Sequence, residues 1–441
     1  MAHRFPEGHV FYRRLDRAYP LAVRAEGAWI VDEEGRRYLD ASGGAAVANL
    51  GHDLGDLAEA VAAEIRTLGY VNGTQFTHRA VEELSAELCA VMPGDLDFAY
   101  FLSSGSEAIE AAVKLARQFW LEAGRPEKWK VISRVPSYHG NTLAALALSG
   151  REHYRRIYGP LLLPFPRIPA PDPYRDAAGP GTTGEALEAE ILRQGPETVA
   201  AFVAEPIGGA AGGAVVPPPG YWPRVAEVCR RHDVLLIADE VLCGMGRTGR
   251  WLAAEHFDLV PDVVVLGKGL NAGAVPLSAL VVRRGIVEAL AAGSGAFNHA
   301  QTYSHHPALC AAGLATVRRL KGERLVERAA ALEAQLFAAL EGVAAHPRVG
   351  QVRGRGMLAA LEFVADRATG EPFPRSRRVT ERVVEQAFAN GLILWSNTGH
   401  VDGERGDLVL VAPPLDIEPA EIQEIGRRLE LTLSEIAWED S

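Results

Sequence analysis

The sequence predicts an α/β protein with a mostly parallel sheet between helices and a second, smaller α+β lobe. Short apolar runs alternate with helical stretches through the middle of the 441-residue chain. These runs are rich in Val, Ile and Leu and lack polar alternation, as is typical of strands buried on both faces of a sheet. After about residue 325 the pattern changes to longer helices separated by single strands, which indicates the second lobe.

The elements of the main sheet follow a first region of short strands, expected at Trp29–Val31 and Tyr38–Leu39. Amphipathic patterns then predict helices over Leu57–Leu68 and Val81–Val91. Pro164–Pro173 holds five prolines in ten residues and is predicted to be an irregular excursion. The strands of the main sheet are expected at Ala99–Leu102, Lys130–Ser133, Ala201–Ala204, Val234–Ala238, Val263–Leu266 and Ser278–Val282.

The second lobe is predicted to begin with a long helix at Leu325–Leu340. An apolar run at Leu358–Val364 and a helix near Arg378–Ala389 follow. Strands are expected at Leu392–Trp395 and Leu408–Val411, and a closing helix starts at Pro419, where proline suits the first helical turn.

Composition and charge narrow the class of partner. Hydrophobic residues make up 48% of the chain, enough for a sizeable core. Lys and Arg total 45 against 56 acidic residues, and the net charge of −11 argues against nucleic acid or an anionic membrane as partner. The four cysteines are far apart, so neither a zinc ribbon nor a disulfide framework is expected. Without an apolar leader or a membrane-length apolar stretch, the sequence predicts a soluble, cytoplasmic protein.

Two strand ends carry an acid and a lysine. The stretch Val234–Gly249, VLLIADEVLCGMGRTG, places Asp239 at the carboxyl end of an apolar strand, where α/β folds bind ligands. Lys268 ends the next apolar strand between two glycines, where it is accessible as a Schiff-base nucleophile. Taken singly, Asp239 is also compatible with an ordinary strand-ending acid and Lys268 with an exposed turn lysine. No Walker phosphate loop surrounds Lys268, since Gly269 stands where Ser or Thr is required.

Two further segments lie just past predicted strands. Ser103–Ala108 opens a helix with small residues, which leaves backbone N–H groups free for a phosphate, although an ordinary helix cap is a compatible interpretation. In Ser137–Thr142 an aromatic ring, Tyr138, precedes an accessible glycine, and it can stack on a planar cofactor or simply pack in the core. Together, a phosphate cradle, a stacking ring, an acid and a lysine meet the needs of pyridoxal phosphate.

The chain closely resembles class III (omega) aminotransferases of the pyridoxal-phosphate fold-type-I superfamily over essentially its whole length. This resemblance implies a large cofactor-binding domain over residues 56–325 and a small domain formed by residues 1–55 and 326–441. The matching segments are Asp40–His52 (DASGGAAVANLGH), Gly105–Arg117 (GSEAIEAAVKLAR), Tyr138–Thr142, Glu205-Pro206, Asp239–Gly249, Gly267–Leu277 and Thr302–Ala312 (TYSHHPALCAA).

The resemblance implies a role for each residue at the centre of the site. Lys268 would bond to the aldehyde carbon of pyridoxal phosphate and then move the proton between substrate carbon and cofactor as general acid and base. Asp239 would pair with the pyridinium nitrogen, with Glu205 beside it. Tyr138 would stack over the ring and Val241 would pack under it.

The resemblance also implies how the phosphate is held. Gly105 and Ser106 would bind it, and His139 and Gly140 would complete the cofactor site. Thr302 would reach the phosphate of the neighbouring subunit, which makes the active unit a homodimer, with a tetramer left open. No metal is expected, because the adjacent histidines at 305 and 306 point apart.

Departures from the family pattern narrow the substrate. Family members that act on ornithine, acetylornithine or 4-aminobutyrate carry an arginine where Asn141 stands, and those that bind glutamate carry a gated arginine where Leu410 stands. The acidic gate of the same machinery is replaced by Ala210. The chain thus lacks three residues that together bind a substrate carboxylate in those members, and this disfavours 2-oxoglutarate and ornithine as substrates.

The chain is more similar to the amine:pyruvate or β-amino-acid branch. Ala46 stands where aromatic-amine enzymes often have a tryptophan, so the pocket is expected to be wider unless a neighbour refills it. Arg405, in the polar loop Gly399–Asp407, is the candidate cation for an acceptor carboxylate, and the alternative is a solvated loop charge.

The predicted function is a ping-pong transaminase that moves an amino group from an amine or amino acid to a 2-oxo acid such as pyruvate. A class III mutase, a decarboxylating aminotransferase or a 2-oxoglutarate-dependent omega-amino-acid aminotransferase would use the same lysine and acid. A catalytically inactive binding subunit is a further alternative, which the intact cofactor positions argue against.

Overall fold

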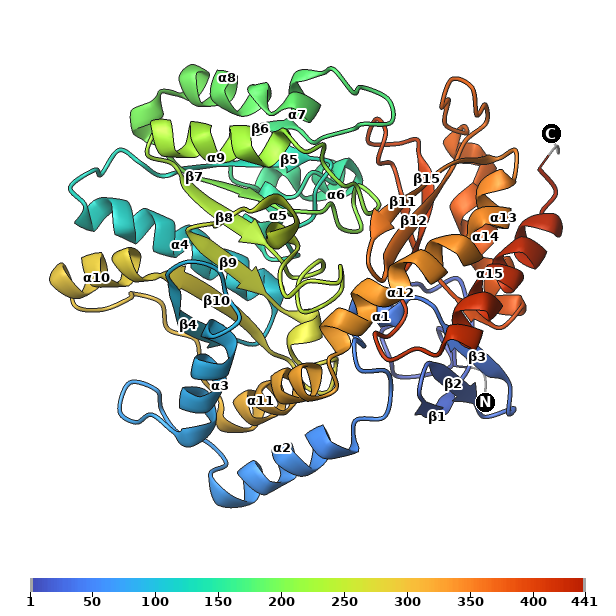
Figure 1. The fold of residues 1–441 in the computed structure, drawn as a ribbon, viewed down its shortest axis with the longest axis horizontal. Coiled ribbons are helices and arrows are strands. Elements are labelled where there is room, and N and C mark those ends of the chain that lie inside the picture. The colour runs from blue at the N-terminus through green and yellow to red at the C-terminus, as the bar shows by residue number, and fades with distance from the viewer. Residues whose placement is uncertain (1–2, 439–441) are drawn as a thin grey trace.

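A seven-stranded sheet forms the centre of the larger lobe in the computed structural model, which describes residues 3–438. Its strands lie in the order β4-β10-β9-β8-β7-β5-β6 (Figure 1). All neighbours are parallel except at β10, which is antiparallel to both β4 and β9, so the predicted mostly parallel sheet is confirmed. The strands are β4 (Leu96–Leu102), β5 (Lys130–Val135), β6 (Arg167–Pro169), β7 (Val199–Ala204), β8 (Leu235–Asp239), β9 (Val263–Leu266) and β10 (Ser278–Arg283).

The sheet is buried on both faces because its side chains divide between two hydrophobic clusters. Along β9, Val263 and Val265 belong to one cluster, whereas Val264 and Leu266 belong to the other. This alternation within an uninterrupted apolar run is the physical reason why the strand sequences lack polar residues. Helices α4, α5 and α10 supply the first cluster, and α2, α3, α9 and α11 supply the second.

The helices of the larger lobe mostly connect successive strands. Ser104 caps the longest of them, α4, by accepting a hydrogen bond from the Glu107 N–H at 3.3 Å. Helix α1 (Gly43–Ala46) precedes the lobe in the chain. The helices of the lobe are α2 (Gly55–Thr67), α3 (Arg79–Cys89), α4 (Gly105–Glu122), α5 (Leu143–Leu148), α6 (Glu152–Tyr158), α7 (Pro180–Thr183), α8 (Glu185–Gln194), α9 (Tyr221–Arg231), α10 (Arg284–Ala292) and α11 (Pro307–Gly322).

The smaller lobe combines both ends of the chain, drawn in blue and red on the right of Figure 1. One sheet, β1-β2-β3-β13, joins N-terminal strands to a C-terminal one, and the other has the order β11-β12-β15-β14. This arrangement supports the predicted division of the chain, although the boundaries at residues 56 and 325 stay a prediction. The strands are β1 (Ala22–Glu26), β2 (Trp29–Asp32), β3 (Arg37–Asp40), β11 (Val349–Arg355), β12 (Leu358–Phe363), β13 (Leu392–Ile393), β14 (Trp395–Thr398) and β15 (Asp407–Val411). The helices are α12 (Leu325–Ala339), α13 (Glu341–Ala345), α14 (Val379–Ala389) and α15 (Pro419–Ser434).

Two details of the sequence prediction are wrong. The proline-rich segment is not wholly irregular, because Arg167–Pro169 forms β6 at the edge of the large sheet, the position where proline is tolerated in a strand. The predicted strand Leu392–Trp395 is two strands, since β13 pairs with β3 and β14 pairs with β15 in a different sheet. The chain therefore changes sheet at Leu394, and this change turns Trp395 towards the larger lobe.

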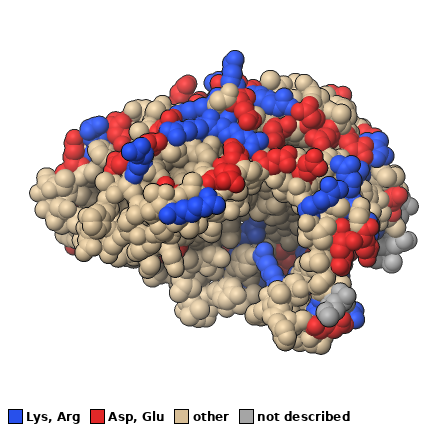
Figure 2. Space-filling model, turned by 90° about the horizontal axis from the view of Figure 1, so that it is seen from below, with Lys and Arg blue, Asp and Glu red and all other residues tan. Residues whose placement is uncertain are grey.

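The surface of one face carries both signs of charge. Figure 2 shows Lys and Arg interspersed with Asp and Glu across its upper part and a hollow in its middle. Within residues 3–438, every helix is too short or too polar to cross a membrane.

Candidate active site

The predicted site residues meet at one edge of the large sheet. Strands β4, β5, β7, β8 and β9 all run in the same direction, since β10 is antiparallel to both of its neighbours. Their carboxyl ends therefore lie at one edge, where α/β sheets bind ligands. The residues that end or follow these five strands are, in chain order, Ser103–Ser106, Tyr138–Gly140, Glu205, Asp239 and Lys268.

A cavity of about 170 Å³ opens at this edge. It brings together every residue predicted for the cofactor from within one chain, and it adds three that were not predicted for that role: Ala210, Leu242 and Trp395. The complete lining consists of Gly105, Ser106, Tyr138, His139, Gly140, Glu205, Ala210, Asp239, Val241, Leu242, Lys268 and Trp395.

Asp239 is held by two partners at the base of the cavity. Its Oδ2 lies 2.7 Å from Nδ1 of His139, and its Oδ1 accepts a hydrogen bond from the Val241 N–H at 3.1 Å. The Asp239 and His139 side chains are both almost fully buried. Two fixed partners in a buried setting hold the carboxylate in one orientation, which suits a group that must face a cofactor nitrogen.

Lys268 follows β9 in a single 3₁₀ turn, Lys268–Leu270, with a left-handed φ of 43°. Such a φ is unfavourable for a residue with a Cβ, and strained residues of this kind concentrate at functional sites. Burial lowers the pKa of its ammonium to about 8, against the opposing charges of Asp239 and Glu205. The neutral amine, which is the form able to attack an aldehyde, is therefore far more populated near neutral pH than in an ordinary lysine.

The N-terminus of α4 forms one wall of the cavity. Gly105 and Ser106 open this helix and line the cavity, and the N–H groups of a first helical turn have no intrahelical partners. A Cβ on Gly105 would lie 3.0 Å from Val241, and a Cβ on Gly140 would lie 2.5 Å from the Ser106 Oγ. The absence of side chains at both glycines therefore keeps the backbone approachable by an anion.

Asn141, the residue that stands in place of a substrate-binding arginine, takes part in this same wall. Its backbone N–H donates to the Ser106 Oγ at 3.0 Å, and its side-chain Oδ1 accepts from that hydroxyl at 3.0 Å. The side chain is therefore committed to Ser106 rather than to the cavity, whose lining does not include it.

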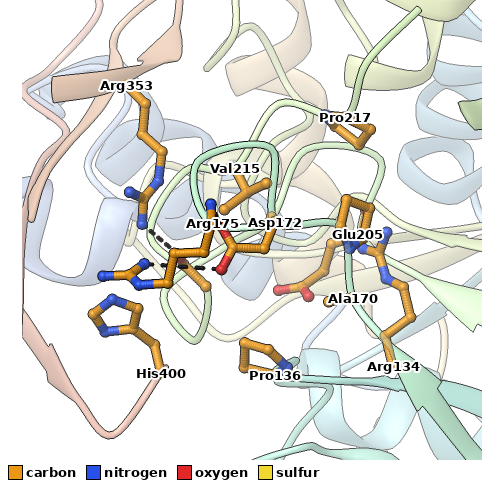
Figure 3. Close-up of a pocket in the computed structure, with 13 residues that line it drawn as sticks. Arg134, Pro136, Ala170, Asp172, Arg175, Glu205, Val215, Pro217, Arg353 and His400 are labelled. Carbon is orange, nitrogen blue, oxygen red and sulfur yellow. Dashed lines mark hydrogen bonds and ion pairs between the residues drawn. The ribbon is translucent and has the colours of Figure 1, made fainter. Parts of the chain in front are cut away.

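Glu205 separates the cavity from a smaller one of about 40 Å³. Its Oε1 accepts a hydrogen bond from the Gly209 N–H at 3.1 Å, and burial raises the pKa of its carboxyl. Across the smaller cavity lie Arg175, Arg353 and His400 (Figure 3). Both arginines are ion-paired to buried Glu362, so this neighbouring cavity is a structural ion cluster and the larger one holds the reactive groups.

Three predicted residues do not line the cavity of their own chain. Thr302 is exposed, and its carbonyl oxygen accepts a hydrogen bond from the Tyr70 hydroxyl at 3.0 Å. Arg405 is paired with Asp402 and Glu371, each at 2.7 Å, on the surface of the 399–407 loop. Ala46 is 1% exposed and packs in the hydrophobic cluster whose members Ala210 and Leu242 line the cavity.

Two nearby residues were missed by sequence reasoning. Trp395 lines the cavity from the smaller lobe, with its ring centroid 5.2 Å from the Lys268 Nζ. Arg151 lies over the Tyr138 ring at 4.9 Å from its centroid. Neither residue lies at the end of a strand of the large sheet. The pattern that predicted the other residues, a polar side chain at the end of an apolar strand, is therefore absent from both positions.

The residues present fit pyridoxal phosphate. The cavity offers a lysine of lowered pKa, an oriented buried carboxylate, an aromatic ring and a helix N-terminus, and these are the groups that its aldehyde, ring nitrogen, ring face and phosphate require. The Nε2 of buried His139 has no hydrogen-bond partner in the described chain, which leaves a polar contact for a bound group. Residues 3–438 hold no cluster of three His, Cys, Asp or Glu side chains suited to a metal.

Fold and site together define a pyridoxal-phosphate enzyme of fold type I, and the comparison with known families agrees. The chain belongs to the class III aminotransferases, whose family model matches residues 12–433. It is therefore a pyridoxal-phosphate-dependent transaminase.

Its relatives match over nearly the whole chain. It is 42% identical over 417 residues to the aminotransferase YodT of Bacillus subtilis, and this match covers 93% of this chain and 94% of the relative. It is 38% identical over 426 residues to the putrescine–pyruvate aminotransferase of Pseudomonas aeruginosa, with coverage of 94% and 90%. The solved structure of an (S)-enantioselective omega-transaminase from Thermomicrobium roseum is 37% identical with a TM-score of 0.89, and the match covers 95% of this chain and 93% of that one.

Proposed function

We propose that this transaminase moves an amino group from a primary amine or a β- or omega-amino acid to pyruvate by a ping-pong cycle. The observation that carries the proposal is the single cavity that combines Lys268, Asp239 and the N-terminus of α4 without any arginine in its lining, among the residues that the structure describes. Relatives named putrescine–pyruvate and taurine–pyruvate aminotransferase, at 38% and 36% identity, support pyruvate as the acceptor.

The cofactor supplies an electron sink for the bond that breaks at the substrate carbon. Lys268 is the residue proposed to hold it covalently and to carry the substrate proton on its Nζ. Asp239, kept in place by His139, is proposed to keep the ring nitrogen protonated, with Glu205 beside it. Tyr138 and Val241 are proposed to enclose the ring from its two sides.

The phosphate is assigned to Gly105 and Ser106 at the start of α4, with Gly140 leaving room beside them. The exposed position of Thr302 supports the further proposal that it serves the phosphate of a neighbouring subunit in a homodimer. In that arrangement each site would be completed by its partner.

The lining of the cavity argues against 2-oxoglutarate and ornithine. Asn141 is bonded to Ser106, Leu410 is fully buried in β15, and Ala210 presents only a methyl group to the cavity. Arg405 stays the proposed cation for the pyruvate carboxylate. It would have to exchange Asp402 and Glu371 for the substrate, which is feasible because surface ion pairs contribute only about 0–1 kcal/mol.

The test is spectroscopic. Protein loaded with pyridoxal phosphate is mixed singly with L-alanine, a β-amino acid, an arylalkyl amine and L-ornithine, and the visible band of the lysine-bound cofactor is followed. We expect alanine and the amine to bleach the band and ornithine to leave it. Bleaching by ornithine alone would overturn the proposal. Release of carbon dioxide or an isomer, in place of a free keto product, would favour a decarboxylating enzyme or a mutase.

A further inference from the structure

One wall of the cavity comes from the smaller lobe and is made by a single aromatic side chain. Trp395 is the first residue of β14 and lies opposite Leu410 on β15. It packs against the hydrophobic cluster that contains Ala46, Ala210 and Leu410, all of which are 2% exposed or less. A ring supported by a rigid, buried cluster has little freedom to move aside for a ligand.

The position of this ring relative to Lys268 places it next to the substrate. The Lys268 Nζ lies 5.2 Å from the centre of the Trp395 ring. The substrate amine must replace the Lys268 Nζ on the cofactor, so the amine nitrogen must come close to the position of that atom. Substituents on the carbon that carries the amine then lie within van der Waals reach of the ring, because one or two bond lengths span the remaining gap.

The chemistry of the ring face selects among those substituents. The face of an indole is electron-rich, so it favours apolar and cationic groups and disfavours a carboxylate. The rest of the cavity has the same preference, since its other ionisable groups besides Lys268 include the acids Asp239 and Glu205. Ala46 belongs to the hydrophobic cluster against which Trp395 packs and is not among the residues that line the cavity.

We propose that Trp395 is a specificity-determining residue of the amine half-reaction, which receives the apolar or cationic substituent of the donor, limits its size and disfavours a carboxylate in that position. The proposal rests on the proposed function, because it assumes amine donors. In this role the Trp395 ring, which comes from β14, fills space in the pocket that the small side chain of Ala46 leaves unfilled.

The experiment compares Trp395→Ala and Trp395→Phe with the wild-type holoenzyme on isopropylamine, 1-phenylethylamine and L-alanine. The kcat/KM of the donor half-reaction is measured from the cofactor absorbance. For Trp395→Ala we expect two ratios of kcat/KM to rise by at least about tenfold. The first is the kcat/KM for 1-phenylethylamine divided by that for isopropylamine, and the second is the kcat/KM for L-alanine divided by that for isopropylamine. Trp395→Phe should keep both ratios within about threefold, because it retains an aromatic face. Trp129→Ala, which removes a 44% exposed tryptophan outside the cavity, is the matched control.

A second readout does not depend on turnover. Tryptophan fluorescence is quenched by a nearby cofactor with a steep dependence on distance, and the chain has seven tryptophans. On titration of the apoprotein with pyridoxal phosphate, Trp395→Phe should lose a larger share of the quenching than Trp129→Phe. If Trp395→Ala fails to fold, Trp395→Leu takes its place, and the fluorescence comparison still applies.

Failure of this inference is distinguishable from failure of the proposed function. Wild-type protein that converts no amine contradicts the proposed function. Wild-type protein that converts amines while Trp395→Ala leaves both ratios unchanged overturns the role of Trp395 alone, as does equal loss of quenching in the two phenylalanine variants.

Discussion

The Nδ1 atom of His139 lies 2.7 Å from the Oδ2 atom of Asp239, and the pair joins two strands of the large sheet that are not neighbours. His139 follows β5 and Asp239 ends β8, with β7 between them. The contact therefore depends on the assembled sheet, and it positions the acid at the base of the cavity through a residue that needs no contact with substrate.

We predict that His139→Leu weakens both the fold and the cofactor site. The change leaves buried Asp239 with the Val241 N–H as its remaining partner, at an expected loss of about 1–3 kcal/mol in the free energy of unfolding. His139→Asn, whose amide N–H can occupy the place of the imidazole Nδ1–H, should recover part of that loss. The measurements are thermal unfolding of the apoprotein and the Kd of pyridoxal phosphate. A Kd unchanged in His139→Leu would contradict the proposed link between this pair and the cofactor.

Cofactor uptake should depend on pH through Lys268. Its pKa of about 8 means that the neutral amine fraction, and with it the rate of covalent attachment, rises through a midpoint near pH 8 and levels off at higher pH. The charge of Arg151 is among the causes that lower this pKa, so Arg151→Gln should move the inflection to higher pH. Arg156→Gln, at a side chain that is 60% exposed, is the control. Stopped-flow absorbance at a series of pH values measures the rate, and an inflection near the ordinary lysine value of 10.5 would refute the effect of burial.

The proposed role of Arg405 predicts a selective loss. Arg405→Ala should raise the KM for pyruvate about tenfold or more, because charge-assisted hydrogen bonds contribute about 1.5–3 kcal/mol. It should leave an aldehyde acceptor, which lacks a carboxylate, unaffected. Arg156→Ala controls for the removal of one surface charge. Equal KM values in Arg405→Ala and wild type would show that Arg405 is a loop charge held by Asp402 and Glu371.

Stability of the large lobe should depend on a fully buried lysine outside the active site. The Nζ of Lys128 contacts the carbonyl oxygens of Pro196, Val199, His232 and Asp233 at distances from 2.7 to 3.2 Å. Lys128→Met leaves these oxygens without that donor, and we expect a loss of about 3 kcal/mol in the free energy of unfolding. Lys130→Met, which removes a donor to one carbonyl, should lose less than about 1 kcal/mol. Chemical denaturation of the three proteins measures the difference, and equal stabilities would contradict it.

Local sequence patterns predict the larger lobe well because its strands are buried on both faces. In β7, β8 and β9 almost every side chain is apolar, so the strands, and the polar residues at their ends, stand out in the sequence. The same patterns fail where pairing decides the structure. Nothing local in Leu392–Trp395 indicates that its two halves join different sheets.

The sequence by itself determined the fold class. It also predicted that most of the proposed cofactor residues meet at one edge of the sheet, because they lie at or just after the carboxyl ends of parallel strands. Only the tertiary structure decided which residues complete the cavity. Trp395 lies near Lys268 from the other lobe, Ala46 is buried and does not line the cavity, and Arg405 is paired with two acids. These outcomes depend on how separate segments pack against one another, and periodicity within a single segment carries no information about such contacts.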